Sequence, residues 1–73
     1  MNSKYFMIRK WVINYIKKAQ CPVTQSEIAC DAGSYDDAFL AGRSIQDLIH
    51  QGKISLNSGW LEFIQISEQK VSE

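Results

Sequence analysis

The chain has 73 residues, of which 45% are hydrophobic and 22% are charged. This length allows one domain, and the hydrophobic content is high enough to exclude a wholly disordered chain. Eight lysine and arginine residues balance eight aspartate and glutamate residues, so the net charge is zero. Because neutralised phosphates supply much of the affinity of proteins for nucleic acid, this balance leaves only a local basic patch as an argument for that partner.

The sequence contains no apolar run long enough for a signal peptide or a membrane span, so we expect a cytoplasmic protein without membrane contact. If residues 25–31 are helical, the Cα atoms of Cys21 and Cys30 should lie roughly 10 Å or more apart, which is too far for a disulfide. We therefore expect two free thiols that act as small buried fillers. With His50 as the one histidine and no C-x-x-C pair, we expect no metal site.

The first predicted element is a helix from Tyr5 to Ala19. Its apolar residues recur at offsets of 0, 3, 4, 7, 8 and 11 and form one helical stripe: Ile8, Trp11, Val12, Tyr15, Ile16 and Ala19. The aromatic residues of this stripe indicate core packing. Pro22 ends the helix, because the residue before a proline is pushed towards extended conformations. Residues 21–23 are predicted to form an extended link with a stub of strand.

A second, short helix is predicted after Thr24, which opens the sequence pattern of a capping box. Gly33 lies where a left-handed residue would end this helix, and Ser34 or Asp36 would cap a third helix. That third helix runs to Gly52, and its buried face is predicted to consist of Ala38, Ala41, Ile45, Leu48 and Ile49. Two helices joined by a glycine-containing turn make a helix-turn-helix, around which the rest of the chain is organised.

Residues 53–56 alternate as a strand does, and Asn57, Ser58 and Gly59 are predicted to form a three-residue hairpin loop. The return strand is predicted over 60–66, and residues 68–73 read as a polar tail, so the single domain has an ordered core of about 5–67. Both faces of the return strand carry large apolar residues, although a strand over a small core has one buried face. Either the tail or the N-terminal turn covers the excess, or a protein partner or a second copy of the chain does.

This order of three helices and a C-terminal two-stranded β-hairpin resembles the winged helix-turn-helix superfamily over residues 5–67. The resemblance rests on residues 24–29 (TQSEIA), which look like the opening of the second helix of such domains. It also rests on residues 48–54 (LIHQGKI), which look like the passage from the third helix into the wing. The resemblance implies an α+β, mostly α-helical domain. In DNA-binding members of the superfamily, the third helix enters the major groove and the wing contacts the backbone or the minor groove.

Under this resemblance, we expect a small DNA-binding transcriptional regulator that uses the third helix and the wing to bind double-stranded DNA. Dimers read paired half-sites, so tight binding implies a homodimer. Arg and Gln side chains can read base edges, and a helix start can hold phosphates. The expected DNA contacts are Ser34 and Tyr35 at the helix start, Arg43 and Gln46 along the helix, and Lys53 and Asn57 on the wing.

Acidic and apolar residues of the third helix oppose this interpretation. Asp36, Asp37 and Asp47 are expected to be exposed and to repel phosphates. The alternative is a winged-helix module that binds a protein partner or itself through apolar residues of the third helix and the return strand: Phe39, Leu40, Leu61 and Phe63. The sequence contains no phosphate-binding loop, nucleophile motif or paired His-carboxylate motif, so we expect neither enzyme activity nor a cofactor.

Overall fold

The computed structural model describes residues 3–57 and 60–64. Within them the chain forms three helices and three short strands, which makes it an α+β, mostly α-helical fold, as the sequence predicts. In chain order these are α1 (Ser3–Ala19), β1 (Val23–Thr24), α2 (Gln25–Asp31), α3 (Tyr35–His50), β2 (Ile54–Asn57) and β3 (Trp60–Phe63). Among the described helices, none combines the length and the apolar composition needed to cross a membrane.

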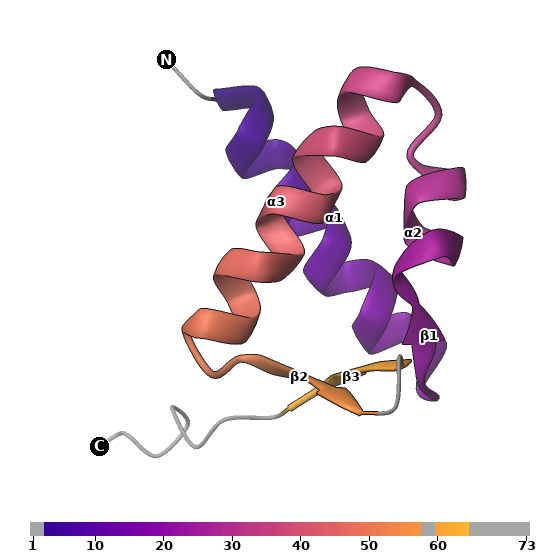
Figure 1. Ribbon diagram of the computed structural model, residues 1–73, viewed down its shortest axis with the longest axis vertical. Helices are drawn as coiled ribbons and strands as arrows, with labels where there is room; N and C mark the ends of the chain where they lie inside the picture. Colours follow the sequence, from indigo (N-terminus) through magenta and orange to yellow (C-terminus); the bar gives the residue numbers. More distant parts are fainter. Residues whose placement is uncertain (1–2, 58–59, 65–73) are drawn as a thin grey trace.

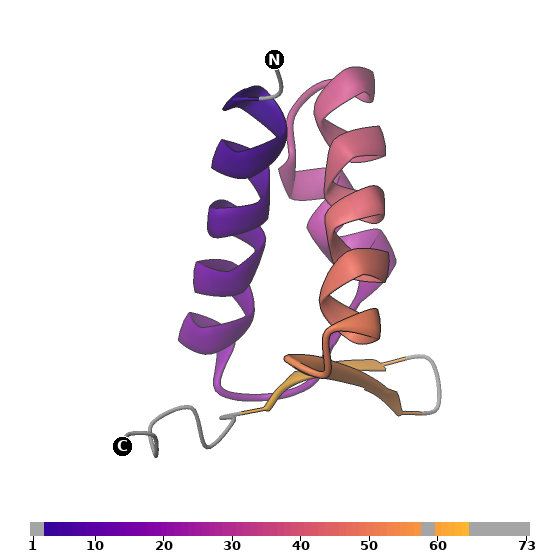
Figure 2. The ribbon, with the colours of Figure 1, turned by 90° about the vertical axis from the view of Figure 1, so that its left-hand side faces the viewer.

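The helices form one layer and the strands lie across its end (Figure 1). α1 and α3 pack against each other and both run towards the strands, while α2 packs against α3 (Figure 2). The core lies between these elements, and its members among the described side chains are Val12, Ile16, Val23, Ile28, Ala41, Ile45, Leu48 and Ile54. Each helix contributes to it, and so do β1 through Val23 and β2 through Ile54, so the sheet is part of the same small core.

α1 follows its predicted stripe and ends at Ala19 as predicted. Val12 and Ile16 are buried, and the remaining members of the stripe pack against the core, together with Ile13, which the sequence pattern had missed. The helix begins at Ser3 rather than Tyr5. It ends because Gln20 has a φ of 55°, a left-handed conformation that cannot continue the helix, so the chain has already turned before Pro22.

The predicted caps of α2 and α3 are confirmed. The Oγ1 atom of Thr24 accepts from the backbone N–H of Glu27 at 3.1 Å, and the Oγ atom of Ser34 accepts from that of Asp37 at 3.1 Å. Ser34, not Asp36, is therefore the cap of α3. Gly33 has a φ of 99°, which is the left-handed conformation expected after α2.

The buried face of α3 contains one polar residue that the apolar pattern did not predict. Ala41, Ile45 and Leu48 are buried as expected, and Ser44 is buried beside them. The Ser44 hydroxyl donates to the carbonyl of Leu40 at 2.9 Å. This bond to the preceding turn satisfies the hydroxyl without a partner from another element, which is how a serine can occupy a core position.

The strands form an antiparallel sheet in the order β1-β3-β2, so the predicted two-stranded hairpin gains a third strand. Val23 pairs with Leu61, so the predicted strand stub covers the second edge of β3. Such pairing stabilises a hairpin that would be marginal alone. Asn57 pairs with Trp60, which leaves a two-residue rather than a three-residue connection, and β3 ends at Phe63. Of the predicted continuation to residue 66, Ile64 lies outside β3, although its backbone N–H donates to the carbonyl of Lys53 at 3.0 Å. Residues 65 and 66 and the tail lie outside the described residues.

Both cysteines are free, as predicted, but they are not buried fillers. Cys21 and Cys30 are exposed. Cys21 lies in the link between α1 and β1, outside any helix face. Cys30 is two residues after the buried Ile28 on α2, a rotation of about 200° that turns it away from the core.

Candidate functional site

One narrow stripe of α3 is turned away from the rest of the domain. It consists of residues at offsets of 0, 4, 8, 11 and 15, all of them exposed: Tyr35, Phe39, Arg43, Gln46 and His50. We call this set the outer stripe. Its position follows from the helical period, because the buried residues of α3 occupy the opposite side. Tyr35 and Phe39 are 89% and 65% exposed, which is high for aromatic side chains in a small domain.

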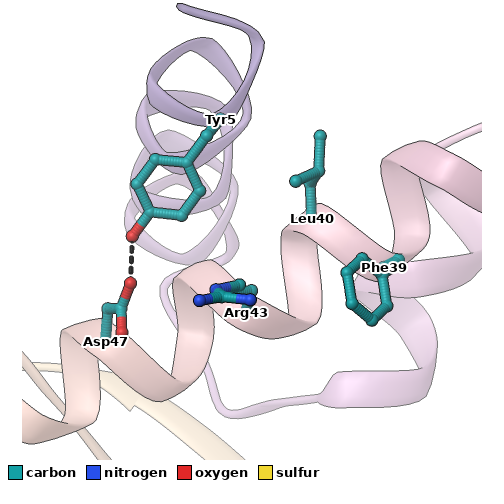
Figure 3. Close-up of a pocket in the computed structure, with 5 residues that line it drawn as sticks. All are labelled: Tyr5, Phe39, Leu40, Arg43 and Asp47. Carbon is teal, nitrogen blue, oxygen red and sulfur yellow. Dashed lines mark hydrogen bonds between the residues drawn. The ribbon is translucent and has the colours of Figure 1, made fainter. Parts of the chain in front are cut away.

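A second face of α3 lies against α1 and contains two of the three carboxylates that were expected to face a partner. The Oδ1 atom of Asp37 lies 3.0 Å from the Nζ atom of Lys4. The hydroxyl of Tyr5 donates to the Oδ2 atom of Asp47 (Figure 3). Both carboxylates are half-buried, so the expectation that they are exposed is wrong for them and holds for Asp36.

The sequence did contain a signal for this second face. Positions 37, 40, 44, 47 and 51 recur at helical spacing and form a mixed polar stripe. Leu40, expected to be exposed, is half-buried on this stripe, and Gln51 accepts a hydrogen bond from Arg9 of α1. The pattern of apolar residues does not show that this face contacts α1. The contact consists largely of hydrogen bonds, and the groups that bind these side chains lie elsewhere in the sequence.

The hydrogen bond from Tyr5 raises the pKa of its phenol, mainly because the phenol donates to the Asp47 carboxylate. The phenol is therefore protonated at neutral pH and acts as a donor. Asp47 in turn has an oxygen bound to a neutral group of α1. The Asp47 carboxylate is thereby bound to α1, although the same side chain also lines the space beside Arg43 on the outer stripe.

A shallow hollow runs along the outer stripe and extends to the start of α2. It is lined by Gln25, Ala38, Phe39, Gly42, Arg43, Gln46, Asp47 and His50. Gly42 leaves its floor open, and the Nε2 atom of Gln25 lies 3.4 Å from where a Cβ atom of residue 42 would be. Sequence reasoning missed Gln25 as a site residue, because only the packing of α2 on α3 brings it beside the outer stripe.

The predicted DNA-contact residues divide into two groups in space. Tyr35, Arg43 and Gln46 lie together on the outer stripe, with Ser34 at its beginning, where the hydroxyl also caps the helix. Lys53 lies beyond the other end of α3 and is half-buried; its backbone N–H donates to the carbonyl of Leu48. The side chains of Asn57, Leu61 and Phe63 lie outside the described part of the structure.

The outer stripe offers donors of a kind suited to base edges. Within residues 3–57 and 60–64, no hydrogen bond or ion pair holds the guanidinium of Arg43, an exposed residue whose side chain carries five N–H donors. Gln46 adds an amide with both donors and an acceptor.

A second polar contact lies on the other side of α1. The hydroxyl of Tyr15 donates to the Oδ2 atom of Asp31 at 2.6 Å and joins α1 to α2. This hydrogen bond is the main reason that the pKa of Tyr15 rises to about 12. A separate shallow hollow beside this contact is lined by Tyr15, Asp31 and Cys30, among others, but among the described residues no three metal-ligating side chains come together. We interpret this contact as a tether between helices.

Comparisons with known proteins found no relative of this chain. No family model matches the chain, and neither a curated protein nor a solved structure matches it. An assignment of function therefore rests on the outer stripe, the hollow beside it and the charges around them.

Proposed function

We propose that this protein is a small DNA-binding regulator of transcription with the winged helix-turn-helix arrangement. In this proposal α3 enters the major groove and the β2–β3 hairpin acts as the wing. The order of elements supports it, because a short α2, a turn at Gly33 and a longer α3 precede the hairpin directly. A helix with its side chains is about 10–12 Å wide, which matches the major groove.

The observation that carries the proposal is the separation of charge around α3. Arg43 and Gln46 lie in the middle of the exposed outer stripe, while Asp37 and Asp47 contact Lys4 and Tyr5 of α1. The main electrostatic objection, that α3 presents three carboxylates to phosphates, is thereby weakened, because two of them are bound by α1; Asp36 stays exposed, and Asp47 still lines the hollow beside Arg43. The zero net charge then implies a modest affinity that depends on a few contacts.

Each predicted residue has a role in this proposal. Arg43 reads guanine and Gln46 reads adenine, because their side chains form bidentate hydrogen bonds with those bases. Ser34 and Tyr35 hold a phosphate at the N-terminal end of α3, where the helix dipole favours negative charge. Lys53 and Asn57 contact the DNA backbone from the wing. A single module covers few base pairs, so a homodimer is the expected tight-binding form.

An amide NMR titration with a random-sequence duplex tests the proposal. At low salt we expect shifts over residues 34–46 and 53–57 that disappear at high salt, because phosphate contacts release counterions. Replacing Arg43→Ala should weaken binding to a selected duplex by about 1–3 kcal/mol. Lys18→Ala on α1 removes the same charge at another exposed position and is the matched control. Shifts confined to α1, or no shifts, would reject the proposal.

The exposed aromatic residues favour a second candidate, a protein-interaction module. Phe39 belongs to the outer stripe and is 65% exposed, and Phe6 and Met7 on α1 are exposed to a similar degree. Of the proposed contacts Phe39, Leu40, Leu61 and Phe63, Phe39 gives the clearest test. Phe39→Ala should leave the fold intact and abolish self-association in sedimentation if this candidate is right. Under the DNA-binding proposal the same variant sediments like the wild-type protein.

A further inference from the structure

Asp47 lies between two groups that can bind its carboxylate. One is the phenol of Tyr5 on α1, which donates to the Oδ2 atom of Asp47. The other is the guanidinium of Arg43, which lies four residues earlier on the same helix. All three side chains line one hollow with Phe39 and Leu40, and Figure 3 shows Arg43 one turn before the Tyr5–Asp47 contact.

Opposite charges four residues apart on a helix attract each other, so Arg43 and Asp47 would form an ion pair if nothing else held the carboxylate. In the described structure no such ion pair is present, and Tyr5 occupies one carboxylate oxygen instead. The rotation from Arg43 to Asp47 is about 40°, which takes the carboxylate from the edge of the outer stripe to the α1 side. The contact with Tyr5 fixes it there.

We propose that Tyr5 is a positioning residue for DNA recognition: by holding the Asp47 carboxylate on α1, it keeps the Arg43 guanidinium available on the outer stripe. This inference rests on the proposed DNA-binding function and adds to it a residue of α1 that touches no DNA. The inference also explains why an acidic residue lies beside the outer stripe. Asp47 joins α1 to α3 without opposing Arg43.

The substitution Tyr5→Phe keeps the ring and removes the donor. It leaves Asp47 free to pair with Arg43, and DNA must then compete with that ion pair. Exposed ion pairs of this kind change an equilibrium by about two- to fivefold, so duplex affinity should fall by about that factor. A circular dichroism melt checks that the variant is folded, because a structural loss of Tyr5 would lower affinity for a different reason.

A double-mutant cycle with Asp47→Asn separates positioning from general charge effects. Removing a carboxylate near DNA raises affinity in any background. If charge alone matters, the gain is the same in the wild-type protein and in Tyr5→Phe. If Tyr5 prevents the ion pair, the gain is larger in Tyr5→Phe, and the double variant regains the affinity lost on removing the phenol. Fluorescence anisotropy with one duplex at fixed low salt measures all four proteins.

A second readout needs no DNA. The side-chain Nε–Hε NMR signal of Arg43 should move in Tyr5→Phe and return in the double variant, because only the ion pair changes its surroundings. Tyr15→Phe is the matched control, since it removes the other phenol–carboxylate bond of α1, the one to Asp31 on α2. It should leave both the Arg43 signal and the affinity unchanged.

The outcomes distinguish this inference from the function on which it rests. Coupling in the cycle together with movement of the Arg43 signal supports the inference. If the wild-type protein binds DNA and Arg43→Ala weakens binding, but the cycle shows no coupling, Tyr5 is a tether only and the inference fails while the function stands. If the wild-type protein binds no duplex, both fail.

Discussion

Tyr5 and Tyr15 use the same side-chain pairing to attach α1 to two different helices. Tyr5 donates to Asp47 on α3 and Tyr15 donates to Asp31 on α2. A hydrogen bond from a neutral phenol to a carboxylate is charge-assisted and stronger than one between neutral groups. In both tyrosines this bond is the main cause of a raised pKa. These two bonds at the edge of the small core therefore help to orient α1 relative to α2 and α3.

The raised pKa of Tyr15 makes part of the stability depend on alkaline pH. The unfolded pKa is about 10 and the folded pKa is about 12, so the folded state binds the phenolic proton more tightly. The contribution of Tyr15 is therefore complete below pH 10 and is lost as the pH rises from about 10 to about 12. Urea titrations at pH 8, 10 and 11.5 should show a smaller decline of stability for Tyr15→Phe than for the wild-type protein. Tyr35→Phe, at a position that is 89% exposed, is the control, and its stability should decline with pH as much as that of the wild-type protein.

At the scale of the element, α3 divides its surface into three faces with different tasks. Ala41, Ile45 and Leu48 join the core, the polar face contacts α1, and the outer stripe faces solvent. The helical period of 3.6 residues allows this division within 16 residues. Gly42 lies beside the outer stripe, where the hollow between α2 and α3 is open. A glycine there lowers helix stability and lets Gln25 approach.

Gly42→Ala should stabilise the protein by about 1 kcal/mol, because alanine is the better helix former. The added Cβ atom would lie 3.4 Å from the Nε2 atom of Gln25, an ordinary contact with the end of a flexible side chain. The control is Gly33→Ala, where a φ of 99° disfavours any side chain and the expected change is a loss of about 1–2 kcal/mol. Urea unfolding midpoints measure both. Equal signs for the two variants would contradict this account.

At the scale of the whole molecule, the described side chains of β2 differ sharply in exposure along the strand. Ile54 in β2 is 1% exposed and belongs to the core, whereas Leu56, two residues later on the same strand face, is 55% exposed. The hairpin therefore extends beyond the helices, as Figure 2 shows for the end of β2. Val23 in β1 is also buried, so β1 and the first part of β2 both contribute buried side chains where they meet the helices.

This difference in burial between Ile54 and Leu56 predicts different effects on stability when each residue is replaced by alanine. Ile54→Ala should lower the free energy of unfolding by about 2–5 kcal/mol, because it leaves a cavity in the core. Leu56→Ala removes a side chain of the same size from the overhanging part and should change stability by less than about 0.5 kcal/mol. Chemical denaturation of both variants measures the contrast. A large loss for Leu56→Ala would mean that the hairpin is covered.

Local signals in the sequence predicted most of the fold. The capping residues Thr24 and Ser34, the left-handed Gly33 and the apolar stripe of α1 depend on neighbours within a few positions, and the structure confirms them. The errors concern long-range contacts. The pairing of β1 with β3 and the contacts of Asp37 and Asp47 with α1 depend on elements that are distant in the sequence.

The candidate site likewise has one part that the sequence predicts and another that only the structure shows. The sequence by itself determined that Tyr35, Arg43 and Gln46 share an exposed stripe of a capped helix, because helical spacing fixes which residues share a face. Only the tertiary structure decided that Asp37 and Asp47 turn towards Lys4 and Tyr5 and that Gln25 lies beside Gly42. A helix defines its own faces, but the direction in which each face points is set by the elements that pack against it.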